Sequence, residues 1–383
     1  MSANYLQYIG SFYHDQNAFP SVRFLVSGID PEVRQIVGDN ITASTFSRGL
    51  PLFIIDNTRG ATNFSDVLGG YHVVDALNGD INLCKDLFTI GTLKGISHLR
   101  SFLSDFGFDS IRSMKVAEYL NFVKETERRL GNDSPLTVEI LEQYGGTMLV
   151  EHKLNQLVES GVLTEDNRHY LLGRYAEVSS AAADFEMLFS LLAPFMGNTE
   201  PSRDMAVHLP IGEFVADEPM QHLLCKLLVC YIKGAPSESA VLILDDGNGD
   251  QCCIVELLKD LPVSTEVHMI SNDVFTFSDA SLGIVMNKFP ARIYTRHENM
   301  GSCMKIESHC GNIDVVKRSS TITVDRRFRA NTAWDMLLGT NKSETEITNT
   351  PVRDPLFRKE YIQALPPRTG IVDFCGNKIP FSF

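Results

Sequence analysis

Short, unbroken apolar runs alternate with longer amphipathic stretches near the N-terminus. The apolar runs cover residues 21–27, 51–55 and 70–74. Runs without a polar alternation are typical of strands that are buried on both faces of a parallel sheet. Between the first two runs, Asp30 suits the N-cap of a helix and Pro31 suits its first position, so a helix is predicted over 31–47.

A second sequence pattern begins near residue 98, where amphipathic helical periods replace the apolar runs. Helices are predicted over 114–130, 137–144, 148–160 and 164–192, with breaks at Gly131, Pro135, Gly145 and Gly161. No strand-like run interrupts them. This pattern predicts an all-helical segment from residue 98 to residue 200.

The alternation of strands and helices returns after residue 200. Strands are predicted at 205–209, 240–244, 266–270, 291–296 and 370–374, and helices at 217–232, 251–261 and from 281. The stretch 313–350 is polar and is predicted to be irregular. We therefore predict one α/β domain, formed by 1–97 and 201–383, that an all-α insertion (98–200) interrupts. Three sequential domains are the less favoured alternative, because neither flank alone supplies enough strands for a stable parallel sheet.

Charge and cysteine content narrow the class of protein. The formal net charge of −14 excludes a strongly basic nucleic-acid coat, and acidic residues outnumber basic ones within 97–200. No uncharged apolar stretch reaches the ~18 residues of a membrane span, and no signal peptide is visible. The eight cysteines form no C-x-x-C pair and suggest reduced thiols in the cytoplasm. Cys303, His309 and Cys310 are the nearest approach to a metal cluster, and reduced, buried thiols are the favoured interpretation of these cysteines.

Two strand ends carry candidate chemistry, since ligands of parallel sheets bind at the carboxyl ends of strands. Gly28, Val33, Arg34 and Gln35 lie at the spacing of a phosphate-binding loop, G-x-x-x-x-G-K-[ST]. The pair Asp245–Asp246 ends an apolar strand, as the Mg²⁺-binding and water-activating acids of such ATPases do. An acid that only caps the next helix is the alternative interpretation of this pair.

The order of the motifs is more specific than any one of them. The chain resembles the type IV secretion and conjugation coupling proteins (TraG/TraD-like), within the HerA/FtsK superfamily of RecA-like hexameric motor ATPases, and shared ancestry with VirB-type secretion ATPases is an alternative. The matching segments, all quoted from this chain, are Leu52–Gly60 (LFIIDNTRG), 70–75 with 82–83, the helical segment, Met205–Pro210, 241–246, Met269–Asn272, 306–311 and 361–372. The resemblance implies a RecA-like, mostly parallel sheet flanked by helices, with a sensor position at Asn272.

The chain departs from this family at the positions that handle phosphate. Val33, Arg34 and Gln35 stand where the family has glycine, lysine and a hydroxyl residue. Asp246 replaces the usual glutamate and Asn272 the usual glutamine; no arginine occurs within 259–266, and the membrane helices of full coupling proteins are not seen. Arg34 is expected to pair with an acid, with Asp56 and Asp245 as candidates.

Two functions follow from the resemblance. The first is a pseudo-ATPase without cofactor, a structural or substrate-recruiting subunit of a secretion or conjugation apparatus. Its partners would be proteins of that machinery, among them an active paralogous ATPase. The assembly would be a homo- or hetero-hexamer. The protein would lie in the cytoplasm, or at the inner face of the membrane through those partners. The alternative is an active, divergent motor that translocates DNA or protein, with ATP and with Mg²⁺ on Asp245. The missing lysine and hydroxyl argue against hydrolysis, and the acidic insertion favours protein over DNA as partner.

Overall fold

The computed structural model describes most of the chain as two compact units. The described residues are 23–59, 67–84, 99–100, 102–104, 108–132, 138–214, 217–234, 238–247, 252–324, 343–374 and 376–382. Met1–Thr295 and Pro367–Phe383 make up the first unit, here called the sheet unit. Arg296–Pro366 make up the second, here called the ribbon unit.

The sheet unit is built on a ten-stranded sheet with the order β12-β11-β8-β1-β7-β6-β2-β5-β4-β3. Its strands are β1 (Phe24–Ser27), β2 (Leu52–Asn57), β3 (Val67–Leu68), β4 (Tyr71–Asp75), β5 (Met205–Leu209), β6 (Ala240–Asp245), β7 (Glu266–Ser271), β8 (Ala291–Tyr294), β11 (Thr369–Phe374) and β12 (Asn377–Ser382). The seven strands from β8 to β4 are all parallel, and the antiparallel pairs lie at the edges. Strands from both sides of the helical segment thus join one sheet.

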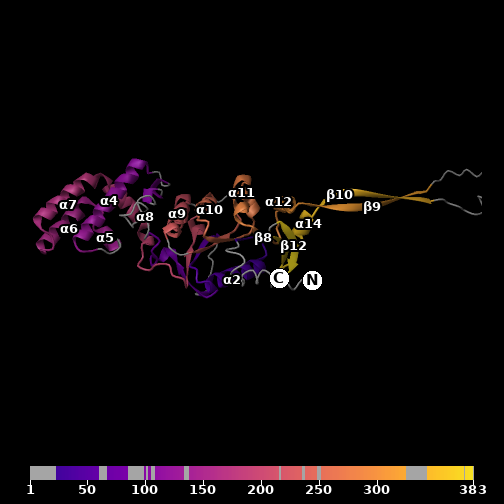
Figure 1. Cartoon of the computed structure of the whole chain (residues 1–383), viewed down its shortest axis with the longest axis horizontal. Helices are drawn as coiled ribbons and strands as arrows, with labels where there is room; N and C mark the ends of the chain where they lie inside the picture. The colour runs from indigo at the N-terminus through magenta and orange to yellow at the C-terminus, as the bar shows by residue number, and fades with distance from the viewer. Residues whose placement is uncertain are drawn as a thin grey trace, which may run out of the picture. The chain divides into compact units, whose positions relative to one another are not determined.

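Helices cover both faces of this sheet. Figure 1 shows α9 (Glu218–Gly234), α10 (Cys252–Asp260) and α11 (Asp279–Lys288) on one face and α2 (Pro31–Ser47) on the other. The core under α2 is aliphatic and includes Val26, Val33, Val37, Ile41, Ile54, Leu242 and Ile270. A mostly parallel sheet between two helical layers confirms the predicted RecA-like fold class.

Local chemistry explains the bounds of α2. Asp30 is its N-cap and accepts hydrogen bonds from the backbone N–H groups of Glu32 and Val33, while Pro31 occupies the first helical position. Val33, Val37 and Ile41 recur every four residues and are buried against the sheet. The prediction of a helix over 31–47 is therefore confirmed at both ends.

From residue 99 to residue 195, the described part of the segment between β4 and β5 consists of helices joined by short turns. Its helices are α4 (Ser110–Arg129), α5 (Val138–Glu142), α6 (Thr147–Glu159), α7 (Glu165–Val178) and α8 (Ala182–Leu192). The single helix predicted over 164–192 was wrong, because a 3₁₀ turn at Ser179–Ala181 separates α7 from α8. That this segment is an inserted domain with bounds at 98 and 200 stays a prediction.

By length and composition, one helical run in the described chain could cross a membrane, namely Glu165–Phe195. Core helices of globular proteins meet the same test. Phe185, Leu188 and Leu192 are buried here, and 39% of the apolar window is buried inside the protein. By length and composition alone, the run is weak evidence of a membrane span.

The largest error of the sequence-based prediction lies in the ribbon unit. The stretch 313–350, predicted to be irregular, contributes most of β9 (Asn312–Val324) and β10 (Ser343–Pro355), which pair antiparallel over thirteen residues each. These strands contain no continuous apolar run, because they belong to a two-stranded sheet outside the main core. The helices α12 (Met300–Cys310) and α14 (Lys359–Gln363) of this unit were also missed.

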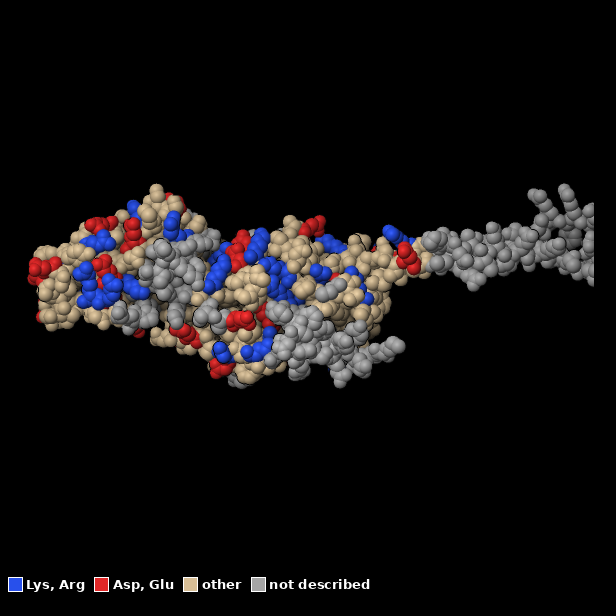
Figure 2. Space-filling view, in the orientation of Figure 1, with Lys and Arg blue, Asp and Glu red and all other residues tan. Residues whose placement is uncertain are grey.

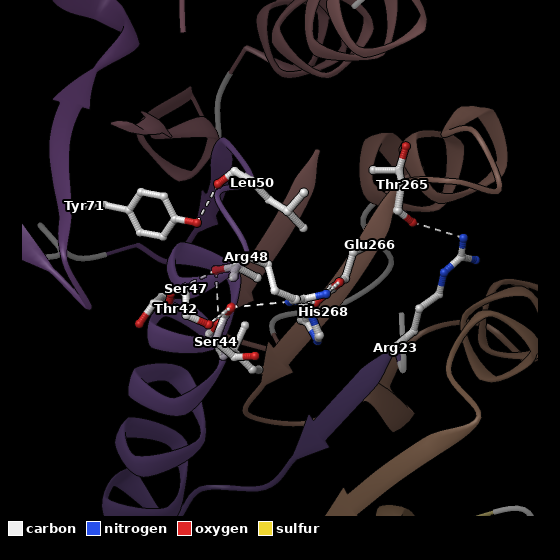
Figure 3. Close-up of polar contacts among 12 residues, drawn as sticks. Arg23, Thr42, Ser44, Ser47, Arg48, Leu50, Tyr71, Thr265, Glu266 and His268 are labelled. Carbon is white, nitrogen blue, oxygen red and sulfur yellow. Dashed lines mark hydrogen bonds and ion pairs between the residues drawn. The ribbon is translucent and has the colours of Figure 1, made fainter. Parts of the chain in front are cut away.

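An ion-pair cluster ties α2 to the amino-terminal end of β7. Arg48, the C-cap of α2, donates two hydrogen bonds to Glu266, at 2.5 and 2.6 Å, and the ring of His268 lies 2.7 Å from the same carboxylate (Figure 3). Burial would raise the pKa of Glu266, but these hydrogen bonds outweigh it and lower the pKa to about 2. This cluster lies at the edge of the sheet opposite the candidate site.

Candidate functional site at the carboxyl ends of the strands

The candidate site lies where the parallel strands β1, β2, β6 and β7 end. Asp245, the last residue of β6, pairs in register with Asn57 of β2 and with Ser271 of β7. Ser27 ends β1, and its hydroxyl accepts a hydrogen bond of 3.1 Å from the N–H of Val274. Four polar side chains thus meet at one edge of the sheet because four parallel strands end there.

The loop between β1 and α2 is short. Gly28 has a φ of 138°, a region that favours glycine, and its N–H donates to the carbonyl of Ser271 at 3.1 Å. The helix begins at Pro31, so Val33, Arg34 and Gln35 are helical residues. A phosphate cradle needs an open loop whose N–H groups point at the ligand. Here only Gly28, Ile29 and Asp30 separate the strand from the helix.

The carboxylate of Asp30 lies at the N-terminus of α2. One oxygen accepts the N–H groups of Glu32 and Val33, at 3.1 and 3.2 Å, and the other accepts the N–H of Arg368 at 2.7 Å. Free N–H groups at a helix N-terminus favour bound anions. In this protein the chain supplies that anion itself.

Arg34 extends from the first turn of α2 toward the acids of β6. Its guanidinium donates to the side-chain oxygen of Asn272. Burial lowers the pKa of Arg34, and the nearby charges of Asp245 and Asp246 oppose that effect. The expected ion pair of Arg34 with Asp245 or Asp56 stays a prediction. The charges of Asp245 and Asp246 favour the protonated guanidinium, while Asp56 accepts hydrogen bonds from Thr58 and lies 3.2 Å from His208.

Asp245 is fully buried and already has several donors. Asn57 donates to one oxygen at 3.0 Å, while Ser271 and the N–H of Gly247 donate to the other at 2.6 and 3.1 Å. Burial raises the pKa of Asp245, and the hydrogen bonds from Ser271 and Asn57 offset part of that rise. These three donors occupy most of the about four acceptor positions of a carboxylate, so a cation at Asp245 would have to share the carboxylate with them.

The other predicted residues divide into two groups. Asp246 lies near Arg59, whose Nε is 3.7 Å from its carboxylate, so the acid at the water-activating position faces a cation. Gln35 is exposed on α2 and is not brought to the cluster. The structure therefore assembles Arg34, Asp245, Asp246 and Asn272.

No group of three or more His, Cys, Asp or Glu side chains in the described residues is arranged to hold a metal ion. Of the candidate metal cluster, Cys303 is buried and donates to the carbonyl of His297 at 3.6 Å. This thiol is thus part of the packing of the ribbon unit.

Several residues of the site were missed by sequence-based reasoning. Asn57 and Ser271 are the last residues of β2 and β7. Their position at the end of an apolar run was therefore a signal that the sequence offered. Arg59 lies in the quoted segment Leu52–Gly60 but was not assigned to the site. Arg368 had no such signal, because its position depends on a turn that is 338 residues from Asp30 in the sequence.

Comparison with known proteins adds a structural likeness. No family model and no curated protein matches the chain. Among solved structures, the unbound bacterial conjugative coupling protein TrwB, lacking its first 70 residues, is 12% identical, with 97% of this chain and 91% of that chain covered and a TM-score of 0.49. TrwB in complex with ADP and Mg²⁺ is 12% identical, with 100% of this chain and 91% of that chain covered and a TM-score of 0.48. VirB4 of Thermoanaerobacter pseudethanolicus is 12% identical, with 94% of this chain and 88% of that chain covered and a TM-score of 0.47. At these values the likeness says nothing about activity. The chain is nonetheless similar in structure to proteins of the group that its sequence motifs indicated.

Proposed function

We propose that this protein is a degenerate, coupling-protein-like pseudo-ATPase that serves as a structural or substrate-recruiting subunit of a type IV secretion or conjugation apparatus. The observation that supports it most is the internal anion at α2. Asp30 occupies the N–H groups that a phosphate would need, and Glu32 adds a second negative charge beside it. A nucleotide would have to displace one carboxylate and approach another.

The acids of β6 support the same proposal. A hydrolytic site needs a carboxylate that is free to hold Mg²⁺ and a base that is free to activate water. Asp245 already accepts three hydrogen bonds, and Asp246 faces Arg59. Each group that catalysis would use is engaged with another part of the chain.

The helical segment is the natural candidate for contact with a protein partner in this role. Acidic and basic side chains are interspersed over α4 to α7 on the face that Figure 2 shows. Such a surface suits specific protein contacts better than uniform binding to a polyanion. One possible assembly is a ring that also contains an active paralogous ATPase. In such a ring, a subunit without nucleotide would have a structural or substrate-recruiting role.

Titration calorimetry with Mg²⁺–ATP tests the proposal on the full chain. We expect no heat of binding and no stabilisation on heating. A ligand present at 100 times its Kd would raise the free energy of unfolding by about 2.7 kcal/mol, which a thermal shift readily detects. Micromolar affinity for ATP would contradict the proposal.

An active, divergent motor is the second candidate, because Arg34 lies close to Asp245 and Asp246 as a phosphate-binding cation would. It predicts ATP turnover that single-stranded DNA stimulates and that Asp245→Ala abolishes. Absence of turnover, both alone and with DNA, rejects it.

A further inference from the structure

Two cysteine side chains meet between α9 and α10. The two helices pack against each other on one face of the sheet (Figure 1). The thiol of Cys253, in the first turn of α10, points at α9, where the side-chain oxygen of Gln221 lies 3.9 Å away and accepts its hydrogen bond. Cys225 lies one turn beyond Gln221 on the same face of α9. The two thiols are therefore neighbours in space, although they belong to different helices.

The protein encloses both sulfur atoms. Cys225 is 3% and Cys253 is 2% exposed. Gln221 is held in its turn, because its side-chain amide donates to the carbonyl of Ile211 at 3.1 Å. Packing thus keeps the two thiols next to each other, which is the first requirement of a disulfide.

A hydrogen bond between the thiols makes them unequal. Cys225 donates to Cys253, which raises the pKa of Cys225 and lowers the pKa of Cys253. Burial opposes the lowering at Cys253, and backbone hydrogen bonds in the first turn of α10 support it. The thiolate is the reactive form of cysteine, and a neighbouring thiol can complete a disulfide with it. Cys253 thus has the properties of an attacking sulfur and Cys225 those of a resolving thiol.

A second pair of cysteines shows what is particular to the first. Cys84 lies near Cys230 of α9, and burial raises the pKa of Cys84, with the charge of Cys230 adding to that rise. The sulfur of Cys84 lies 4.0 Å from the carbonyl oxygen of Leu192. This thiol stays protonated, so proximity alone does not make a pair reactive.

We propose that Cys225 and Cys253 form a redox modification site, at which hydrogen peroxide converts the two thiols into a disulfide. The Cys253 thiolate attacks one peroxide oxygen, the O–O bond breaks, and the hydroxide that leaves takes up the proton that Cys253 has lost. The Cys225 sulfur then attacks the sulfenic acid on Cys253. The S–O bond breaks, the S–S bond forms, and water leaves with the proton of Cys225. Both thiols are oxidised, and the peroxide is reduced to water.

The small size of peroxide suits the burial of the pair. A molecule little larger than water reaches enclosed sulfur atoms during local openings that exclude bulkier oxidants. The disulfide fixes the first turn of α10 to α9, and thiol reductants reverse it. No group at the carboxyl ends of the strands takes part, so the site goes beyond the proposed function and does not depend on it.

Peptide mapping of the full chain under non-reducing conditions tests the site. After treatment with hydrogen peroxide, we expect a cross-linked pair of peptides that joins Cys225 to Cys253 and that a thiol reductant removes. A bridge between Cys84 and Cys230, a bridge through the adjacent Cys252, or no bridge at all overturns the proposal.

Variants separate the roles of the two sulfur atoms. Cys225→Ala is expected to leave a sulfenic acid on Cys253, which a dimedone-type probe labels severalfold more strongly than in the unchanged protein, because no thiol resolves it. Cys253→Ala should give neither the bridge nor labelling of Cys225. Cys252→Ala is the matched control and should keep the bridge. Equal labelling of the remaining sulfur in Cys225→Ala and Cys253→Ala contradicts the assigned roles, and mapping of the unchanged protein decides the proposal if a variant does not fold.

Discussion

Glu266 shows how a single buried charge is kept ionised in this protein. Glu266 is 2% exposed, and Arg48 and His268 surround its carboxylate with hydrogen bonds (Figure 3). A buried carboxylate without such partners would favour its neutral form. The pairing makes the charged form the stable one, so the contribution of this residue depends on pH.

The pH dependence of Glu266 has a definite sign. Its pKa is about 2 in the folded protein against a usual 4.5, so its stabilising effect is complete above pH 4.5 and is lost as the pH falls toward 2. The shift corresponds to on the order of 3 kcal/mol. Urea unfolding between pH 5 and pH 2.5 should show a smaller acid loss in Glu266→Gln than in the unchanged protein.

Asp314 offers a control for that measurement. Its ion pair with Arg353 is exposed on both sides, and such pairs contribute about 0–1 kcal/mol. Asp314→Asn should therefore follow the acid unfolding of the unchanged protein. Identical acid profiles for Glu266→Gln and Asp314→Asn would show that Glu266 is not the group responsible.

At the scale of elements, α4, α6 and the turn that follows α5 are joined at one carboxylate. Glu127 of α4 accepts hydrogen bonds from Tyr144 at 2.7 Å, from Asn132 at 2.9 Å and from Lys153 of α6. The ammonium of Lys153 also lies 4.3 Å from the centre of the Tyr144 ring. Burial would raise the pKa of Glu127, but these donors lower it.

Removing this carboxylate leaves Lys153 largely buried without its counter-charge, which typically costs about 3–5 kcal/mol. Glu127→Ala should therefore reduce the free energy of unfolding by about 3 kcal/mol, as followed by helical circular dichroism in urea. Glu125→Ala, which removes a partly exposed pair with Arg129, should cost less than about 1 kcal/mol. Equal losses in the two variants would refute the role given to Glu127.

Helices and strands that are marked by neighbouring residues in the sequence were predicted well. Elements without such a mark were missed. The bounds of α2 and β5 were predicted to the residue, because a cap and an apolar run are properties of adjacent residues. The break between α7 and α8 was missed, since neither glycine nor proline marks Ser179–Ala181. The ribbon β9–β10 was missed because its strands pair with each other outside the main core.

At the scale of the whole molecule, the division into two units predicts two regions of different cooperativity. Ile306 is fully buried in α12, and truncating such a side chain to alanine costs about 2–5 kcal/mol. Ile306→Ala should accelerate hydrogen exchange in α12 and α14 and leave β6 and β7 unchanged. Ile54→Ala, at an equally buried position of β2, should do the reverse. Uniform acceleration by either variant would mean that the units unfold together.

The sequence by itself determined the layers of the fold and the residue types at the candidate site. Apolar runs specify buried parallel strands, and Asp30 with Pro31 specifies where α2 begins, because these signals act between neighbours. The absence of a lysine and a hydroxyl at Arg34 and Gln35 is also a fact of sequence.

Only the tertiary structure decided how those residues are engaged. Arg34 meets Asn272, 238 positions later, and Asp30 meets Arg368, 338 positions later. Whether such residues touch depends on the order of the strands and on the packing of the turns between them. The sequence indicated a site altered at its phosphate-handling positions. The fold brings those residues together so that they bind other residues of the same chain.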